Sequence, residues 1–498
     1  MDPRRTSSAR WANLWLGLDV GSDISLANAM GREIISAGLA NEKFIQHATS
    51  GFDAYKAHVD KYTLERAEHE TGVPADAIRK MAHAYARAPR AQICWTLGIT
   101  EHHNAVDNVV ALINLALLTG HVGRYGSGVN PLRGQNNVQG GGDMGAIPDR
   151  LTGFQHVEND QLRAKFEKAW AVKIQPKRGW HLSDMFEAMD SDREKDEDND
   201  NDHGRLTTLY VLGENPADSE ADRHRALKRL GGLEFLLVQD LFYTRTAELA
   251  DVVLPAAAGA FESEGTVTSS ERRVQRVRRT VPPPVGVRDD LEIIFDLARR
   301  LGHDWGTPDP EAIWNELRLL SPMHGGMSYH RLEEMGGIQW PCYDESHPGE
   351  MFLHGRLWSE PLIGPRAPFS VVEFEPPVDQ LDEQYPIRLT TGRRLDHYNT
   401  GVQTRNYSSP LRREAALDIS PEDGQSHKLR EGERVRMTSR RGTVIAPVHF
   451  DSALRPGLAF LSVHAHDQVA TNELTIDAVD PKSGTAEFKA TAVRIEKM

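Results

Sequence analysis

"LTTLYVLGENPADSEADRHRALKRLGGLEFLLVQD", residues 206–240, decides the fold class. Two short apolar runs, "LTTLYVLG" and "EFLLVQD", flank a polar stretch, "ADSEADRHRALKRLGG", which predicts a capped helix. A third apolar run, "ADVVLPA" at 250–256, predicts another strand. Strand, helix and strand in alternation predict parallel sheets with crossover helices, and therefore an α/β fold.

The first 135 residues show the same alternation of helix and strand signals. In "YTLERAEHETG", Thr63 is a candidate N-cap and Gly72 a candidate helix end. "AQICW" (91–95) predicts a buried strand, and "NAVDNVVALINLALLTG" (104–120) predicts a helix that ends at its last glycine. The longest apolar run of the chain, "VVALINLALL", is too short to span a bilayer.

From about residue 376 the pattern becomes that of a β-rich domain. "GERVRMTSRRGTVIAPVHF" (432–450) alternates around Gly442 as a hairpin does, and "GLAFLSVHAH" (457–466) predicts another strand. We expect a small barrel here, preceded by a Pro-rich linker at 361–377.

Composition excludes several classes of function. The net charge of −14 argues against a nucleic-acid partner, and the acidic run at 190–203 is interpreted as a solvated loop. Only Cys94 and Cys342 are present, which excludes a disulfide framework and an iron–sulfur cluster held by this chain's own thiolates. Two cysteines favour a reducing compartment, so we expect a cytoplasmic location. The sequence predicts no membrane insertion.

The stretch "NPLRGQNNVQGGGDMG" (130–145) suits neither helix nor strand. Its glycines lower helix propensity, and it holds one β-branched residue, Val138. We therefore predict a loop whose backbone closely approaches a ligand. Side-chain amides beside the Arg133 guanidinium suit a ligand that is polar, flat and partly anionic.

Polar residues also follow two predicted parallel strands, where α/β sheets bind ligands. They are "GENP" at 213–216 and "QD" at 239–240, although "GENP" alone is equally typical of a strand-ending turn. Histidine pairs at 102–103 and at 464 and 466 could suggest zinc, but no nearby cysteine or carboxylate completes a ligand set. We therefore predict no metal ligand from this chain.

Nearly the whole chain resembles the catalytic alpha subunit of molybdenum- or tungsten-dependent formate dehydrogenases, which are bis(molybdopterin guanine dinucleotide) oxidoreductases. The most specific piece is "PLRGQNNVQGGGDMGAIPD", close to a signature of the formate-specific branch; "GIQWPC" at 337–342 is similar to that branch too. "GENPADSEAD" and "ESEGTVTSSERRVQR" resemble the middle of the family, and "TTGRRLDHYNTGVQTR" its C-terminal domain.

The resemblance implies two Rossmann-like parallel-sheet domains and a C-terminal β-barrel that binds the dinucleotide. The implied domains are the remainder of a first α/β dinucleotide-binding domain at 1–135, a second α/β domain at 136–360, the linker at 361–377 and the molybdopterin dinucleotide-binding barrel at 378–498.

By the same resemblance, Arg133 lies beside the metal and holds the formate carboxylate. A guanidinium matches a carboxylate bidentately, which a lysine cannot do. The product CO₂ is neutral, so this attraction falls as the product forms. The remaining positions carry over as pterin or dinucleotide contacts: Asp2, Arg4, Gly21, Asp23, Gly98, Gly134, Gln135, Gly213, Asn215, Gln239, Asp240, Asp290, Arg393, His397, Tyr398, Asn472 and Lys489.

The sequence also departs from the family. Family members carry four cysteines for an iron–sulfur cluster and then a Cys or selenocysteine metal ligand followed by His, and none of these is present here. We therefore expect a C-terminal portion of a catalytic subunit, inactive alone. The missing segment or a separate chain would supply a 4Fe–4S cluster, and an electron-transfer subunit would accept the electrons.

Three alternatives stay open. The chain is a catalytically silent pterin-binding remnant, the C-terminal half of a split enzyme, or a related molybdopterin oxidoreductase that acts on another oxyanion such as nitrate. The formate-branch residues around Arg133 favour formate, and the absent metal ligand favours the silent remnant.

Overall fold

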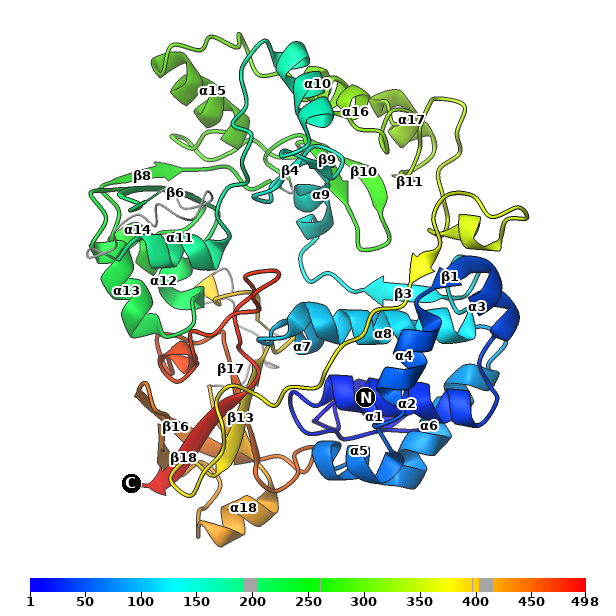
Figure 1. Cartoon of the computed structure of the whole chain (residues 1–498). Coiled ribbons are helices and arrows are strands. Elements are labelled where there is room, and N and C mark those ends of the chain that lie inside the picture. Colours follow the sequence, from blue (N-terminus) through cyan, green and yellow to red (C-terminus); the bar gives the residue numbers. More distant parts are fainter. Residues whose placement is uncertain (191–203, 260, 396, 403–414) are drawn as a thin grey trace. The chain divides into compact units, whose positions relative to one another are not determined.

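The structure is a computed structural model, and it describes residues 1–190, 204–259, 261–395, 397–402 and 415–498 (Figure 1). The described chain forms two compact units. The first unit comprises Met1–Asn130, Pro216–Leu227 and Phe352–Met498, and the second comprises Pro131–Asn215 and Lys228–Met351. The domain boundaries expected from the sequence stay predictions. Most of the acidic run at 190–203 lies outside the described residues.

Helices dominate the start of the first unit because apolar residues recur there at helical spacing. In α2, Ile24, Ala27 and Ile34 are buried, and the helix packs against α5, α6 and α8 (Figure 1). The elements are α1 (Ser7–Trp11), α2 (Asp23–Ser36), α3 (Glu42–Ala48), β1 (Thr49–Ser50), α4 (Phe52–Val59), α5 (Leu64–Thr71), α6 (Ala75–Arg87), β2 (Gln92–Trp95), α7 (Leu97–Thr100), α8 (Ala105–Thr119) and β3 (Gly128–Pro131).

The helix ends in this region follow the sequence. Thr63 accepts a hydrogen bond from the backbone N–H of Arg66, and Gly72 ends α5 at φ +67°. Gly120 ends α8 at φ +71° in the same left-handed conformation. The predicted strand at 91–95 forms as β2, but the prediction that it is buried is wrong, because exposed and half-buried side chains alternate along it.

The chain returns to this core after the second unit. Phe369 and Val372, inside the predicted linker, are buried among the helices of the first unit. Strand β12 (Ala367–Pro368) pairs in parallel with β1 in the same region. A short 3-10 helix, η1 (Gly355–Trp358), precedes it. This segment is therefore packed against the first unit.

The parallel sheet predicted from residues 206–256 lies mainly in the second unit. Its strands β6 (Thr208–Leu212), β7 (Phe235–Asp240) and β8 (Val252–Pro255) are parallel and adjacent in this order. Val211, Leu236 and Val238 form its core with Ala247. The single helix predicted between the first two strands is wrong: the structure has α12 (Pro216–Ser219) and α13 (Arg223–Gly231). Asp222 adopts φ +46° between them, and that left-handed conformation breaks a continuous helix.

Shorter elements complete the second unit. Strands β9, β10 and β11 form a separate antiparallel sheet in the order β11-β10-β9. The elements are α9 (Val138–Asp143), β4 (Arg150–Leu151), β5 (Gln155–His156), α10 (Asp160–Trp170), α11 (Leu182–Ala188), α14 (Arg245–Glu248), β9 (Gly265–Thr268), β10 (Arg273–Val277), α15 (Asp290–Arg300), α16 (Pro310–Leu320), α17 (Tyr329–Glu334) and β11 (Ile338–Gln339).

The C-terminal region is a closed barrel, which confirms the sequence prediction (Figure 1). The predicted hairpin around Gly442 forms from β15 and β16, whose register pairs Thr438 with Thr443. The strand order is β13-β17-β14-β16-β15-β18. The elements are β13 (Ile387–Gly392), β14 (Leu417–Ile419), α18 (Pro421–Ser426), β15 (Arg434–Thr438), β16 (Thr443–Phe450), β17 (Leu458–Ser462), η3 (Thr471–Glu473) and β18 (Thr491–Lys497).

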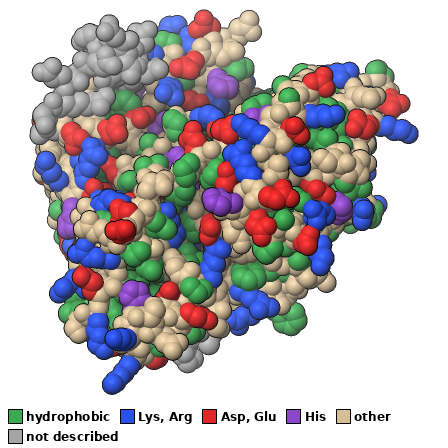
Figure 2. Space-filling model, turned by 60° about the horizontal axis from the view of Figure 1, so that its bottom comes forward, with side chains coloured by type: hydrophobic (Ala, Val, Ile, Leu, Met, Phe, Trp, Pro, Cys, Tyr) green, Lys and Arg blue, Asp and Glu red, His purple; other side chains and the backbone are tan. Residues whose placement is uncertain are grey.

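The mixture of charges on the surface and the hydropathy of the described helices agree with the composition of the chain. On the face shown in Figure 2, Lys and Arg side chains are interspersed with Asp and Glu. Of the helices in the described part of the chain, none combines the length and the hydropathy that a bilayer crossing requires.

Candidate active site

Residues 132–137 of the glycine-rich stretch form a loop in the second unit. The prediction that this stretch forms no helix is wrong for its next part, because Val138–Asp143 form α9. The amide oxygen of Asn137 accepts a hydrogen bond of 2.9 Å from the backbone N–H of Thr268, which ties the loop to β9. A β-carbon at Gly140 would overlap the same Asn137 oxygen, so glycine is required at this position. Gly134 is exposed beside this tie, and Gln135 is half-buried. The loop thus has a fixed base and an accessible tip.

Arg133 lies at the accessible tip, and its side chain is held from one edge. Its Nε donates to Gln139 Oε1 at 3.2 Å, and its backbone N–H donates to Ser270 Oγ at 3.0 Å. Gln139 Nε2 in turn donates to Asp143 Oδ1 at 2.7 Å. Asp143 is fully buried, and burial raises its pKa to about 6. The exposed Arg133 guanidinium is therefore linked through Gln139 to the buried Asp143 carboxyl group.

A second group of predicted residues meets at the carboxyl edge of the parallel sheet in the second unit. Gln239 Nε2 donates to Asp290 Oδ1 at 2.5 Å, and the backbone N–H of Gly213 donates to the carbonyl of Gln239 at 2.8 Å. A β-carbon on Gly213 would meet only open space. Asp240 ends β7 beside them, and burial together with the charge of Asp290 raises its pKa. Burial also raises the pKa of Asp290.

Asn215 follows β6, as Gly213 does, but its side chain has a different partner. Its Oδ1 accepts hydrogen bonds from the backbone N–H and the hydroxyl of Thr246, at 3.3 and 2.9 Å. Asn215 is buried, so its side chain secures the start of α14. The structure thus brings together Gly213, Gln239, Asp240 and Asp290 and directs Asn215 toward the neighbouring helix.

In the first unit, the N-terminal residues lie against the barrel. The guanidinium of Arg4 lies 3.7 Å above the Phe460 ring, and burial lowers the pKa of Arg4. Asp2 Oδ1 accepts from the backbone N–H of Arg4 at 2.8 Å. Arg394 lies 5.6 Å from the same ring and donates to Asp418 Oδ2 at 2.8 Å. This group joins the predicted Asp2 and Arg4 to three residues that were not predicted, Phe460, Arg394 and Asp418.

Arg393, His397 and Tyr398 lie just after β13. Arg393 and Tyr398 are exposed, and the ring of His397 stacks on the ring of His464 at 5.4 Å between centroids. The Nε2 of His464 accepts from the backbone N–H of Arg394 at 2.8 Å. His464, considered in the sequence only as a zinc candidate, therefore positions the backbone of this segment.

Another group in the first unit surrounds a buried ion pair. His102 Nδ1 lies 3.2 Å from Glu487 Oε1, and His102 Nε2 donates to the carbonyl of Gly98 at 3.1 Å. Both ring nitrogens face acceptors, so His102 is an imidazolium, and its pKa is raised: burial lowers it, but Glu487 outweighs that effect. Lys489 Nζ lies 2.6 Å from Glu101 Oε2. Burial raises the pKa of the nearby Asp23, while the His102 charge opposes this shift.

Two further predicted residues of the first unit have structural contacts. Asn472 is buried, and its Nδ2 donates to the carbonyls of Asp218 and Ser219 at 3.1 and 2.9 Å. Gly21 has φ +84°, and a β-carbon there would lie 2.7 Å from Pro377 Cγ. A side chain at that position would be strained, so the turn before α2 requires glycine.

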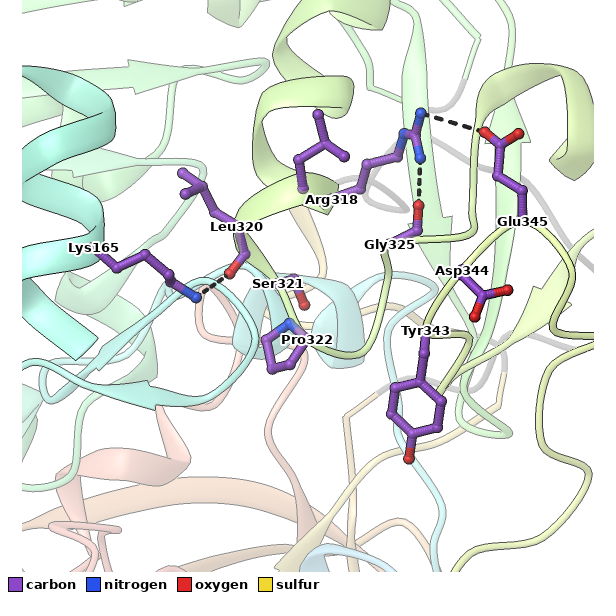
Figure 3. A pocket seen from close by; sticks show the side chains of 10 residues that line it. Lys165, Arg318, Leu320, Ser321, Pro322, Gly325, Tyr343, Asp344 and Glu345 are labelled. Carbon is purple, nitrogen blue, oxygen red and sulfur yellow. Dashed lines mark hydrogen bonds and ion pairs between the residues drawn. The ribbon is translucent and has the colours of Figure 1, made fainter. Parts of the chain in front are cut away.

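An open pocket of about 470 Å³ lies in the second unit beside the end of α16. Figure 3 shows that its two cations are engaged: Lys165 Nζ donates to the carbonyl of Leu320 at 2.6 Å, and Arg318 lies 3.7 Å from Glu345. None of the residues predicted from the sequence lines this pocket. The candidate site residues of the second unit are therefore the Arg133 loop and the edge of the parallel sheet, and those of the first unit are the polar groups described for it above.

Comparison with known proteins identifies the family. Residues 1–300 match the family described as molybdopterin oxidoreductase, and residues 387–492 match the molybdopterin dinucleotide binding domain. The chain belongs to the molybdopterin oxidoreductase family. This molybdopterin oxidoreductase takes molybdenum or tungsten bis(molybdopterin guanine dinucleotide) as its cofactor, as the sequence predicted.

Named relatives cover the whole chain. The oxidoreductase is 40% identical to the F420-dependent formate dehydrogenase 2 subunit alpha of Methanococcus maripaludis, over all of this chain and 71% of that protein. It is 36% identical to formate dehydrogenase H of Escherichia coli, over 99% of this chain and 68% of that protein. Acetylene hydratase from Pelobacter acetylenicus shares the fold, with a TM-score of 0.71 and 20% identity over all of this chain and 73% of that one.

The described residues of the oxidoreductase suit a pterin dinucleotide. In the barrel, buried polar atoms without a hydrogen-bond partner among the described residues include Arg394 Nε, Asp418 Oδ1 and Thr491 Oγ1. Such orphaned atoms are costly unless a polar ligand satisfies them. At the sheet edge, the carboxylates of Asp240 and Asp290 can accept hydrogen bonds from the N–H donors of a polar ligand.

Sequence reasoning missed Asp143, Glu487 and Arg394, which the structure places among the predicted residues, and it considered His102 only as a zinc candidate. A local signal existed for Asp143, because Gln139 and Asp143 are four residues apart and share one helix face. No local signal pointed to Glu487, which is 385 positions from His102.

Proposed function

We propose that this oxidoreductase is the alpha subunit of a formate dehydrogenase, with Arg133 as the catalytic residue that binds the formate carboxylate. The observation that carries the proposal is the geometry of Arg133, which is exposed at the tip of the loop while its Nε is held by Gln139. Relatives named as formate dehydrogenases, 34–40% identical over nearly the whole chain, support the choice of formate.

The chemistry suits this arrangement. Oxidation of formate yields CO₂, one proton and two electrons, and a bound metal–pterin group would supply the acceptor for the electrons. The chain's own contribution is to bind and orient the anion. A guanidinium donates two parallel N–H bonds to a carboxylate and holds its plane fixed. Its attraction falls when the anion becomes neutral CO₂, which favours release of the product.

The other predicted residues belong to the proposal as cofactor contacts. Gly134 and Gln135 flank Arg133 in the loop, where they would approach the pterin. The remaining contacts are proposed in their own units: in the first, Asp2, Arg4, Gly21, Asp23, Gly98, Arg393, His397, Tyr398, Asn472 and Lys489, and in the second, Gly213, Asn215, Gln239, Asp240 and Asp290.

Partners and location complete the proposal. Three relatives are named as alpha subunits, so we expect this chain to work with an electron-accepting subunit. The cysteines Cys94 and Cys342 are both free thiols, which supports a reducing, cytoplasmic compartment.

The test is formate-dependent dye reduction by the enzyme purified with its cofactor and its subunits. Arg133→Lys should lower kcat/KM for formate roughly 100-fold, because a lysine cannot reproduce the bidentate contact. Arg300→Lys is the matched control, since Arg300 is an exposed residue of α15 paired with Asp296. Nitrate reduction in place of formate oxidation would support the alternative substrate, and no turnover of either would support a silent pterin-binding protein.

A further inference from the structure

A buried carboxylate that the formate contact itself does not use lies behind Arg133. Asp143 ends α9 and is fully buried, and both of its oxygens accept hydrogen bonds. Oδ1 accepts from Gln139 Nε2 at 2.7 Å, and Oδ2 accepts from the indole N–H of Trp340 at 2.8 Å. Trp340 belongs to "GIQWPC", a motif that the proposed function leaves without a role.

The carboxylate fixes the orientation of the Gln139 amide. An ionised carboxylate only accepts hydrogen bonds, so the NH₂ group of Gln139 must face Asp143. The amide oxygen then points the opposite way, where it accepts from Arg133 Nε at 3.2 Å. Arg133, Gln139, Asp143 and Trp340 thus form a series of hydrogen bonds in which the exposed guanidinium donates to Gln139, and Gln139 and the buried indole both donate to the Asp143 carboxylate.

This series decides which edge of Arg133 is presented to a ligand. Gln139 occupies Nε, and in the described part of the chain neither Nη atom has a hydrogen-bond partner. A carboxylate can therefore meet the Nη1–Nη2 edge end-on. If the Gln139 amide turned over, its NH₂ group would face Nε, and the guanidinium would lose its support.

We propose that Asp143 is a positioning residue for the carboxylate substrate, acting through Gln139 to present the Nη edge of Arg133, with Trp340 holding Asp143 in place. The inference rests on the proposed function, because it assigns a role in binding the same formate. It adds residues that do not touch the substrate.

The charges around Asp143 give the series a pH dependence. Burial raises the Asp143 pKa to about 6, while Gln139, Trp340 and the charges of Arg133 and Arg272 oppose this shift. Arg272 lies 5.2 Å from the Trp340 ring and stays charged. His324 lies 6.4 Å from that ring, but burial lowers its pKa to about 4, so it is neutral above pH 5. Protonation of Asp143 converts an acceptor into a donor and releases the Gln139 amide.

The experiment compares three variants of the cofactor-loaded enzyme between pH 5 and 8. Trp340→Phe removes one N–H and keeps the ring, and Asp143→Asn removes the ionisable group. Trp314→Phe is the matched control: its indole N–H also donates to a buried acceptor in the same unit, the Met327 carbonyl at 2.6 Å, but has no link to Arg133. Formate binding is followed by saturation-transfer NMR of the formate C–H proton without an electron acceptor, and turnover by dye reduction.

Trp340→Phe should raise KM for formate about fivefold and move the acid limb of kcat/KM to higher pH by about one unit, because a donor to the carboxylate is lost. Asp143→Asn should abolish that limb, raise KM about tenfold and weaken the saturation-transfer signal. Trp314→Phe should match the wild type in all three measurements. Wild-type KM and an unchanged acid limb in Asp143→Asn would overturn the positioning role alone. A wild-type enzyme that neither binds nor oxidises formate would overturn the proposed function and this inference with it.

Discussion

The indole N–H of Trp340 donates to Asp143 Oδ2 across 2.8 Å, although the two residues are 197 positions apart in the sequence. The contact lies in a fully buried environment, where burial raises the Asp143 pKa from 3.8 to about 6. A raised pKa means that the folded chain keeps a proton that the unfolded chain has already released. This residue's contribution to stability is therefore present below about pH 4 and is lost as the pH rises to about 6.

Asp143→Asn should remove this part of the pH dependence. The free energy of unfolding of the wild type minus that of the variant should fall by on the order of 2 kcal/mol between pH 4 and pH 7. Urea titrations at four pH values measure it. Parallel curves for the two proteins would show that Asp143 titrates normally in the folded chain.

For the ion pair of His102 and Glu487 we expect the opposite pH dependence of stability at acid pH. Burial alone would raise the Glu487 pKa, but hydrogen bonds from His102 and His103 and the His102 charge outweigh burial and bring it to about 2. The stabilisation that the Glu487 carboxylate contributes is therefore present above pH 4.5 and is lost as the pH falls toward 2. The raised pKa of His102 adds stabilisation below pH 6.5, which is lost as the pH rises through the folded-state value.

Glu487→Gln should consequently be most destabilising between about pH 4.5 and 6.5. We expect a loss of about 3–5 kcal/mol at pH 5.5, because a buried imidazolium is left without its counter-charge. The control is Glu375→Gln, since Glu375 is mostly exposed and lies 3.8 Å from His103; it should cost under about 1 kcal/mol. Equal effects of the two substitutions on the unfolding midpoint would contradict a buried ion pair.

Local features of the fold were predictable from the sequence, and long-range pairings were not. Thr63 and Gly72 mark the ends of α5 because capping depends on neighbouring residues only. The three strands β6, β7 and β8 follow from apolar runs of the right length. Closure of the barrel pairs β13 with β17 and β18, and no local pattern specifies such partners. The break between α12 and α13 depends on the left-handed Asp222, whose residue type only permits that conformation.

The candidate site shows the same division. Arg133 was found because its surrounding motif resembles a known branch of the family, whereas its support by Asp143 and Trp340 depends on tertiary contacts. The sequence selected Arg393 after β13, while the structure places the neighbouring Arg394 against Asp418. Which of two adjacent arginines turns inward depends on how the strand ends, and two consecutive charged residues carry no periodic signal for it.

The two arginines after β13 can therefore be distinguished by substitution. Arg394→Lys should lower the amount of pterin cofactor per purified chain roughly threefold or more, because lysine cannot keep both the Asp418 bond and a planar donor edge. Arg393→Lys should have a smaller effect, since Arg393 is exposed. Molybdenum or tungsten per chain, measured by mass spectrometry with fluorescence of the oxidised pterin, gives the answer. The reverse order of losses would make Arg393 the cofactor contact.

At the edge of the parallel sheet, Asp290 should contribute to retention of the guanine end of the cofactor. Its carboxylate already accepts from Gln239 at 2.5 Å and can accept further N–H donors, and Asp290→Asn replaces one acceptor oxygen with a donor. We expect roughly tenfold less bound guanine nucleotide, measured in acid extracts of the purified enzyme, because one charge-assisted hydrogen bond is lost. Asp296→Asn on the same helix is the control, because the Asp296 carboxylate pairs with Arg288 and Arg300 and not with Gln239. Equal nucleotide content in both variants would mean that Asp290 serves only to fix Gln239.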